Sequence, residues 1–158
     1  VIPLPDFKQK TVQIGYLART ANLLGIKTPK IACIAPSEQL LPNVISSTEG
    51  ALLAKMADRG QLGNVVVDGP LSLDVALYKE VAEHKKVKGS SVAGDPDCLL
   101  FPNLESANVF FKSVTHLCGG ELAAMVMGTK VPCVLTSRGD TSKTKLFSIA
   151  LACLAVKK

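Results

Sequence analysis

Hydrophobic residues along the chain fall into two kinds of segment, and the two kinds alternate. One kind is a short, nearly continuous apolar run, which is typical of strands that are covered on both faces. Such runs predict five strands, at residues 30–35, 64–67, 97–101, 122–126 and 131–135.

Between these runs, apolar positions recur at helical spacing. Ile14, Leu17 and Ala21 share one helical face, and Gly25 follows as a stop signal. Residues 46–49 (Ser-Ser-Thr-Glu) have the pattern of a capping box before the second helix. The pattern predicts helices near residues 14–24, 51–59, 74–85, 103–117 and 141–158.

Strands that alternate with helices imply βαβ units. We therefore expect an α/β fold with three layers (α/β/α) and a mostly parallel sheet. In such sheets, chemistry lies beyond the carboxyl ends of the strands. Three segments follow predicted strands in this way: 68–70, 102–105 and 136–140.

Composition narrows the class of protein. Of 158 residues, 47% are hydrophobic, which excludes disorder, and 4% are aromatic with no Trp, which disfavours a base-stacking surface and a nucleic-acid partner. No apolar run approaches the ~20 residues that span a bilayer, so no membrane partner is expected. The net charge of +5 weakly favours anionic partners.

The cysteines indicate the cellular compartment, and the first residue indicates how the chain arose. The five cysteines form no CxxC pair, so neither a zinc site nor a redox dithiol is supported, and a reducing cytoplasm is expected. The chain begins with Val1 rather than Met, which suggests a fragment, a processed chain or a chain numbered from its first ordered residue.

Residues 136–140 are the most informative of the three segments. They lie between a predicted strand and a predicted helix, where helix-start N–H groups form an anion site. Arg138 adds a planar cation that can bind two phosphate oxygens, and Ser137 adds a hydroxyl donor. The alternative is a plain cap, in which Asp140 caps the helix and Arg138 forms a surface ion pair. Local chemistry does not choose between the two.

Other candidate motifs are weaker. Residues 89–94 have the glycine spacing of a phosphate-binding loop, but Asp95 follows where a Lys is required. His84 and His116 each lie late in a predicted helix, where a surface or end-capping role is expected. Asn108 and Lys112 are four apart on one helix and could both face a ligand, or could form a solvated stripe.

The order and spacing of several motifs resemble the phosphate acetyl/butyryltransferase family, and its butyryltransferase branch most closely. The resemblance runs nearly end to end. The motifs that carry it are 56–61, 68–71 with Asp74, 92–95, 102–105, Asn108 with Lys112, 134–138 with Asp140, and 148–152.

The resemblance implies a fold like that of isocitrate and isopropylmalate dehydrogenases, with two α/β/α domains and a cleft between them. It implies that this chain is the second half of such a protein. Residues 1–127 would be the second domain. Residues 128–158 would return to complete the first domain, whose N-terminal part is absent from this sequence.

The resemblance also implies the reaction: reversible transfer of a short acyl group between coenzyme A and inorganic phosphate, giving acyl phosphate. The acyl group would be butyryl or branched-chain, with acetyl as a further candidate. Coenzyme A and phosphate are substrates, so no metal or organic cofactor is expected. The family further implies a homodimer. The alternative is a non-catalytic ligand-sensing or oligomerisation domain derived from such an enzyme.

Site residues carry over by position. Ser137 and Arg138 match the family's pair that binds the phosphoryl group and the carbonyl, with Thr136 beside them, and Asn108 and Lys112 match residues that face the cleft. Phe111 stands where a Tyr is usual, and Ala107 stands where a Gly is usual. The position of the family's basic aspartate, near residues 143–144, is not acidic. Either Asp140 takes that role, or this branch deprotonates the thiol differently, or the protein is impaired.

Overall fold

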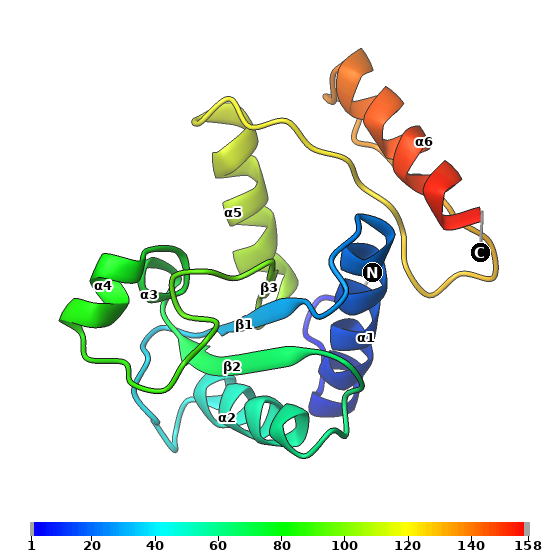
Figure 1. The fold of residues 1–158 in the computed structure, drawn as a ribbon. Coiled ribbons are helices and arrows are strands. Elements are labelled where there is room, and N and C mark those ends of the chain that lie inside the picture. The colour runs from blue at the N-terminus through cyan, green and yellow to red at the C-terminus, as the bar shows by residue number, and fades with distance from the viewer. Residues whose placement is uncertain (1, 157–158) are drawn as a thin grey trace. The chain divides into compact units, whose positions relative to one another are not determined.

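The computed structural model describes residues 2–156 (Figure 1). The chain divides into two compact units, with the division between Ala107 and Asn108. The expected boundary near residue 127 concerns how the chain is shared between two domains of a larger protein, and it stays a prediction. The elements in order are α1 (Phe7–Leu23), β1 (Lys30–Ile34), α2 (Ile45–Asp58), β2 (Val66–Leu71), α3 (Leu73–Leu77), α4 (Lys79–His84), β3 (Cys98–Leu100), α5 (Leu104–His116) and α6 (Ser142–Val156).

The sheet of the first unit has three strands in the order β2-β1-β3, and both pairings are parallel. In register, Lys30 lies opposite Val66, and Ile31 lies opposite Cys98. Helix α2 connects β1 to β2, and α3 and α4 lie between β2 and β3 in the chain. The predicted α/β class with a parallel sheet is therefore confirmed.

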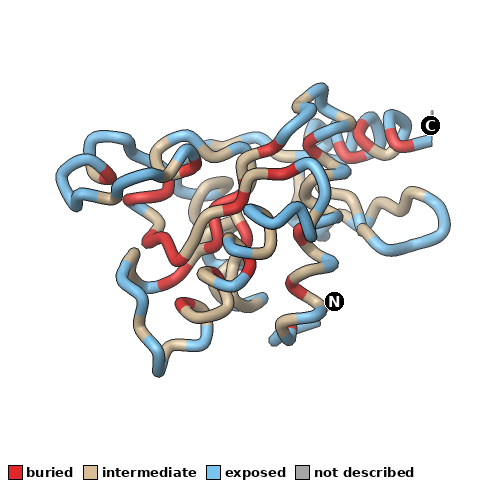
Figure 2. Tube along the Cα trace, turned by 60° about the horizontal axis from the view of Figure 1, so that its bottom comes forward, coloured by how far each residue is buried: buried red, intermediate tan, exposed pale blue. Residues whose placement is uncertain are grey.

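Alternation along β1 sends neighbouring side chains to opposite faces of the sheet. Ile31 and Cys33 enter a core that includes Ile14 of α1 and Leu53 of α2. Figure 2 shows buried residues concentrated along the strands, and exposed residues in the connecting loops. Helices α1 and α2 thus cover one face.

The other face is covered by a second core. Ala32 of β1 packs there with Val75 of α3, Ala82 of α4 and Val92 of the following loop. With helices on both faces, the three-layer arrangement expected from the sequence is present in the first unit.

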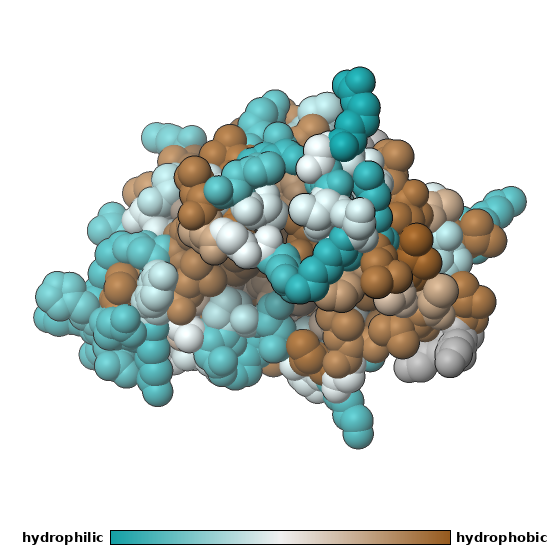
Figure 3. All heavy atoms as spheres, turned by 90° about the horizontal axis from the view of Figure 1, so that it is seen from above, coloured by the Kyte–Doolittle hydropathy of each residue, from teal (hydrophilic) through white to brown (hydrophobic). Residues whose placement is uncertain are grey.

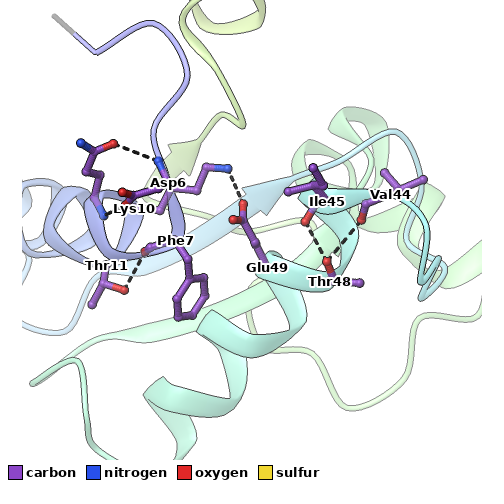
Figure 4. A network of polar contacts seen from close by, with 9 residues as sticks. Asp6, Phe7, Lys10, Thr11, Val44, Ile45, Thr48 and Glu49 are labelled. Carbon is purple, nitrogen blue, oxygen red and sulfur yellow. Dashed lines mark hydrogen bonds and ion pairs between the residues drawn. The ribbon is translucent and has the colours of Figure 1, made fainter.

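A buried ion pair links the two helices of the first face. Lys10 of α1 is 4% exposed, and its Nζ donates to a carboxylate oxygen of Glu49 of α2 (Figure 4). A capping box at the start of α1 fixes the helix end near this pair: the Asp6 carboxylate accepts from the N–H of Gln9 at 2.7 Å. Inside the fold, the Glu49 carboxylate takes the place of water as the hydrogen-bond partner of the Lys10 ammonium.

The predicted capping box at residues 46–49 is wrong. Helix α2 begins at Ile45, so these side chains lie inside the helix. The buried Ser47 hydroxyl accepts from the N–H of Leu41 at 2.8 Å and donates to the carbonyl of Gln39 at 3.0 Å. Ser47 therefore bonds the loop just before α2, and Glu49 bonds the distant Lys10, instead of capping the helix.

The single helix predicted at residues 74–85 is also wrong, because the structure has two short helices that meet at Tyr78. The Ala76 carbonyl accepts from the N–H of Gly94 at 2.9 Å, a contact outside the helix. Gly94 has φ +81°, and a Cβ there would lie 2.5 Å from the Cα of Lys79. The returning loop thus packs against the backbone where the helix is interrupted.

In the second unit, the strands predicted at residues 122–126 and 131–135 are wrong. Among the described residues, these segments share one antiparallel bridge, in which the N–H of Val126 donates to the carbonyl of Cys133 at 2.9 Å. A strand needs a neighbour to pair its backbone groups. These residues find such a neighbour at one position.

The segment before α6 is held to that helix by a buried hydroxyl. Ser148 is fully buried; its Oγ accepts from the N–H of Ala124 at 3.0 Å and donates to the carbonyl of Thr144 at 2.7 Å. Helix α6 and the chain leading to it therefore form one structural element of the second unit.

Candidate functional site

Residues Ser137–Asp140 form a closed turn immediately before α6. The N–H of Ser137 donates to the carboxylate of Asp140 at 2.7 Å, and the N–H of Asp140 donates to the carbonyl of Ser137 at 3.1 Å. Ser137 and Arg138 are exposed, while Thr136 is half-buried. The turn precedes a helix, as predicted, but the strand expected before it is absent.

Helix α6 is capped by Thr141 rather than by Asp140. The Thr141 hydroxyl accepts from the N–H of Thr144 at 3.1 Å, and its carbonyl accepts from the N–H of Lys145 at 3.1 Å. Asp140 instead closes the turn through Ser137. The plain-cap interpretation of Asp140 is therefore wrong.

The guanidinium of Arg138 pairs with no carboxylate among residues 2–156. The surface ion pair considered for it is therefore not formed. An exposed, unneutralised guanidinium beside the first turn of a 15-residue helix suits an anionic ligand, because the helix start adds partial positive charge.

A cavity of about 400 Å³ lies beside this turn, entirely within the second unit. The turn reaches it through Gly139 and Asp140, and His116 borders it from the end of α5. An ion pair between Lys143 and Glu121 stands at its edge, and the Lys143 ammonium lies 5.6 Å from the ring centroid of Phe147. The complete lining is Thr115, His116, Gly119, Gly120, Glu121, Leu122, Gly139, Asp140, Thr141, Lys143 and Thr144.

The second group of expected site residues lies on α5. Asn108 is exposed, Lys112 and Phe111 are half-buried, and the Lys112 ammonium lies 4.7 Å from the Phe111 ring centroid. Within the described residues, no hydrogen bond or ion pair of Asn108 or Lys112 joins them to the Ser137–Asp140 turn. The structure therefore brings Ser137, Arg138 and Asp140 together in one turn. The three α5 residues lie close to one another on their helix, without a bond to that turn in the part of the chain that the structure describes.

The other two segments selected from the sequence have structural roles. Asp68, Gly69 and Pro70 lie inside β2 rather than after it, and the Asp68 carboxylate accepts from the N–H of Gly69 at 2.8 Å. A Cβ at Gly69 would lie 2.6 Å from Cβ of Cys33, so this position needs a glycine. Asn103 caps α5, where its side-chain oxygen accepts from the N–H of Ser106 at 2.9 Å.

Charged groups gather near the end of β2. Lys85 pairs with Asp74 at 3.0 Å and with Glu38 at 3.5 Å. Hydrogen bonding from Ser72, followed by hydrogen bonding from Lys85, lowers the pKa of Asp74 to about 2. This cluster ties α3 and α4 to the loop after β1, which is a stabilising role rather than a catalytic one.

Cysteines and metals offer no further site in the described residues. Burial raises the pKa of the Cys33 thiol to about 12, so it stays protonated and unreactive. Residues 2–156 contain no cluster of three His, Cys, Asp or Glu side chains that could hold a metal ion. Across the same residues, no helix has the length and apolar character needed to cross a membrane.

Four residues around the turn were not predicted from the sequence: Thr141, Thr144, Glu121 and Lys143. The spacing of Thr141 and Thr144 is that of a hydroxyl cap, and it was the available signal for where α6 begins. Glu121 and Lys143 are 22 residues apart, and no local pattern predicts their ion pair. Both residues line the cavity, whose lining comes from segments far apart in the sequence, so the cavity is visible only in the fold.

Comparison with known proteins places these features in a family. The family model described as "Phosphate acetyl/butaryl transferase" matches residues 1–153. The phosphate butyryltransferase of Clostridium acetobutylicum is 44% identical over 150 residues, which cover 95% of this chain and 50% of that protein. The phosphate acetyltransferase of Thermotoga maritima is 40% identical over 148 residues, which cover 94% of this chain and 50% of that protein.

A solved structure agrees with the sequence relatives. The branched-chain phosphotransacylase from Enterococcus faecalis V583 superposes with a TM-score of 0.87 and 31% identity, covering 99% of this chain and 55% of that one. The chain thus spans about half the length of the relatives it matches. With the matching motifs spread over nearly its whole length, the chain belongs to the phosphate acetyl/butyryl transferase family.

Proposed function

We propose that this chain forms part of a phosphate acyltransferase, which transfers a short acyl group reversibly between coenzyme A and inorganic phosphate. Membership of the family and the names of the relatives support the reaction class. The butyryltransferase relatives and the branched-chain structural neighbour favour butyryl or branched acyl groups. Coenzyme A and phosphate enter as substrates, and the proposal includes no metal or organic cofactor.

One observation carries the proposal most directly: the exposed guanidinium of Arg138 stands unpaired, among the described residues, beside the start of α6. Acyl phosphate and phosphate are multiply charged anions. A guanidinium group and the N–H groups at a helix start both bind such anions. They are also hydrogen-bond donors placed where negative charge grows during acyl transfer. The Ser137 hydroxyl adds a further donor in the same turn.

The proposed chemistry needs no covalent enzyme intermediate. The thiol sulfur of coenzyme A attacks the carbonyl carbon of the acyl phosphate, and phosphate leaves with the electron pair of its bond to carbon. Arg138 and Ser137 hold the phosphoryl group and the carbonyl oxygen in this step. Holding two substrates in attack geometry can contribute about 7–11 kcal/mol. Thr136, Asn108, Phe111 and Lys112 line the substrate path in this proposal.

We also propose that an N-terminal half of similar length completes the catalytic site. The chain covers 50% of its sequence relatives. In addition, α6 has exposed apolar side chains on several sides, with Leu146 62% exposed, Ile149 54% and Val156 68%, while Leu151 is buried. A helix that is apolar all round belongs in an interior. Hydrophobic surface is also visible on the face shown in Figure 3.

The family resemblance adds a homodimer in the cytoplasm to the proposal. The cysteines of the described residues are all unpaired, which suits a reducing compartment. An alternative is a non-catalytic module that kept the fold. It is favoured by Phe111, whose ring offers no hydroxyl to a ligand, and by the half-length match.

The experiment measures phosphate-dependent release of coenzyme A from a panel of acyl-CoAs, with the complete protein. We expect turnover with butyryl or branched acyl-CoA, and a loss of activity in Arg138→Ala without a loss of folded structure. Arg19→Ala is the matched control, because Arg19 is an exposed arginine of α1. Absence of turnover with every acyl-CoA would favour the non-catalytic alternative. Wild-type turnover in Arg138→Ala would remove Arg138 from the mechanism.

A further inference from the structure

The cavity beside the Ser137–Asp140 turn is bordered by a side chain that can accept a proton and that has no role in the reaction as proposed above. Attack by a thiol requires that the thiol lose its proton, because the thiolate is the nucleophile. We propose that His116 is the general base that takes this proton, and the acid that returns it in the reverse direction. This assignment rests on the proposed acyltransferase function.

The fold holds His116 at the edge of the cavity. It is the last residue of α5, and the chain turns sharply just after it at Gly119 and Gly120. Gly119 has φ +66°, and a Cβ on Gly120 would lie 2.6 Å from Cγ1 of Val114. The N–H of Gly120 donates to the carbonyl of Val114 at 2.9 Å, which closes the end of the helix. This tight turn places the following residues against the same cavity.

The other ionisable groups of the cavity are already engaged. The Glu121 carboxylate pairs with the Lys143 ammonium, which carries no lone pair to accept a proton while it is charged. The Asp140 carboxylate accepts from the N–H of Ser137 at 2.7 Å. Within residues 2–156, the imidazole of His116 has no hydrogen-bond or ion-pair partner, and it is exposed to an incoming substrate. It is therefore the cavity group with a ring nitrogen available for a proton.

The position of His116 on α5 supports the same role. Asn108, Lys112 and His116 are spaced four residues apart, so they follow one another along a single face of the helix. The first two are among the α5 residues proposed to face the substrates. A ligand bound along this face would contact Asn108 first, then Lys112. At the end of the helix it would reach the imidazole of His116, which borders the same cavity as the turn that carries Arg138.

The proton and electrons balance without a further reactant. The imidazole nitrogen takes the proton of the coenzyme A thiol, and the sulfur forms its bond to the carbonyl carbon. The bond from carbon to the phosphate oxygen breaks, and phosphate leaves with that electron pair. The imidazolium then gives its proton to the departing phosphate, which leaves as hydrogen phosphate. Histidine suits both steps because its side chains commonly change protonation state between pH 5 and 8.

The test compares His116→Gln and His116→Ala in the complete protein, assayed with butyryl phosphate and coenzyme A. We expect kcat to fall roughly 100-fold to 10,000-fold, the usual contribution of general acid–base catalysis, with a KM for butyryl phosphate within about threefold of wild type. The acid-side fall of the pH–rate profile should disappear in His116→Gln. Added imidazole should restore part of the activity of His116→Ala, which a merely structural role would not allow.

His84→Gln is the matched control, because His84 ends α4 in the first unit and does not border the cavity. We expect it to keep wild-type kcat and the wild-type pH profile. A kcat within about threefold of wild type in His116→Gln, or an unchanged acid-side fall, would overturn the assignment of His116 while leaving the acyltransferase proposal in place. Absence of turnover in the wild-type protein would overturn both.

Discussion

The buried ion pair between α1 and α2 offers a direct test of how the first unit is stabilised. The side chain of Lys10 is 6% exposed and that of Glu49 is 16% exposed, and the two groups are each other's partners (Figure 4). Replacing Glu49 with Met keeps a side chain of similar size but leaves the Lys10 ammonium without an acceptor. The variant is expected to lose stability because a charge stays buried without its counterion.

The size of the effect follows from the burial of each partner. Removing one member of a buried pair costs about 3–5 kcal/mol. A cavity of about 10 Å³ borders both side chains, room for roughly one water molecule, and hydration of the ammonium lowers the cost. We therefore expect Glu49→Met to cost about 3 kcal/mol. Lys10→Met should cost less, about 2 kcal/mol, since the carboxylate it strands is more exposed.

The double variant distinguishes the pair from ordinary packing. With Met at both positions no charge remains, and an apolar replacement of a buried pair is often neutral or stabilising. The double variant should therefore lie within about 1 kcal/mol of wild type, far from the sum of the two single costs. The matched control is the exposed pair of Lys55 and Asp58, which are both 64% exposed, and whose removal should cost about 0.5 kcal/mol or less.

Urea unfolding followed by far-UV circular dichroism measures these differences, provided that the slope of free energy against urea is the same in all variants. A cost below about 1 kcal/mol for Glu49→Met would show that the ammonium is hydrated without its partner. A double variant whose cost equals the sum of the single costs would refute the coupling argument.

Three further predictions concern other parts of the chain. Gly94→Ala should lower the free energy of unfolding, and with it the thermal unfolding midpoint. The loss should exceed the ~1 kcal/mol of a left-handed backbone alone, because the added Cβ would meet the Cα of Lys79 at 2.5 Å. Ser148→Ala should cost about 1–3 kcal/mol in urea unfolding, because the N–H of Ala124 loses its acceptor. The pKa of Asp74 is lowered to about 2, so its stabilising effect is complete above about pH 4 and is lost as the pH falls through 2. Unfolding midpoints measured from pH 5 to pH 2 should fall less steeply in Asp74→Asn.

Two of these predictions have a control variant, and Asp74→Asn is compared with the wild type. Gly60→Ala introduces the same backbone strain at φ +70° with open space around the Cβ, so it should cost less than Gly94→Ala. Ser148→Thr keeps the hydroxyl that accepts from the N–H of Ala124. It should therefore avoid the loss of stability that comes from the missing hydrogen bond, and any remaining loss reflects the added methyl group. Equal losses in the two glycine variants, or an unchanged acid slope in Asp74→Asn, would contradict the contacts described here.

Much of the first unit follows from local pattern. The apolar run at residues 30–35 predicts β1 because a strand covered on both faces needs apolar side chains at successive positions. Asn103 predicts the start of α5 because its side chain can accept from the N–H three residues later. The turn before α6 is likewise readable, since Gly139 and Asp140 interrupt the chain just ahead of a helical segment.

What the sequence by itself determined was therefore the α/β class, the main strands and helices of the first unit, and the place of the Ser137–Asp140 turn, because these depend on neighbours a few residues apart. Tertiary structure decided the break at Tyr78, the pairing of Glu49 with Lys10, and the cavity that His116 borders. Each of these depends on a partner far along the chain, such as Gly94 for the carbonyl of Ala76. A short-range pattern contains no information about which distant group will compete for a hydrogen bond or a counterion.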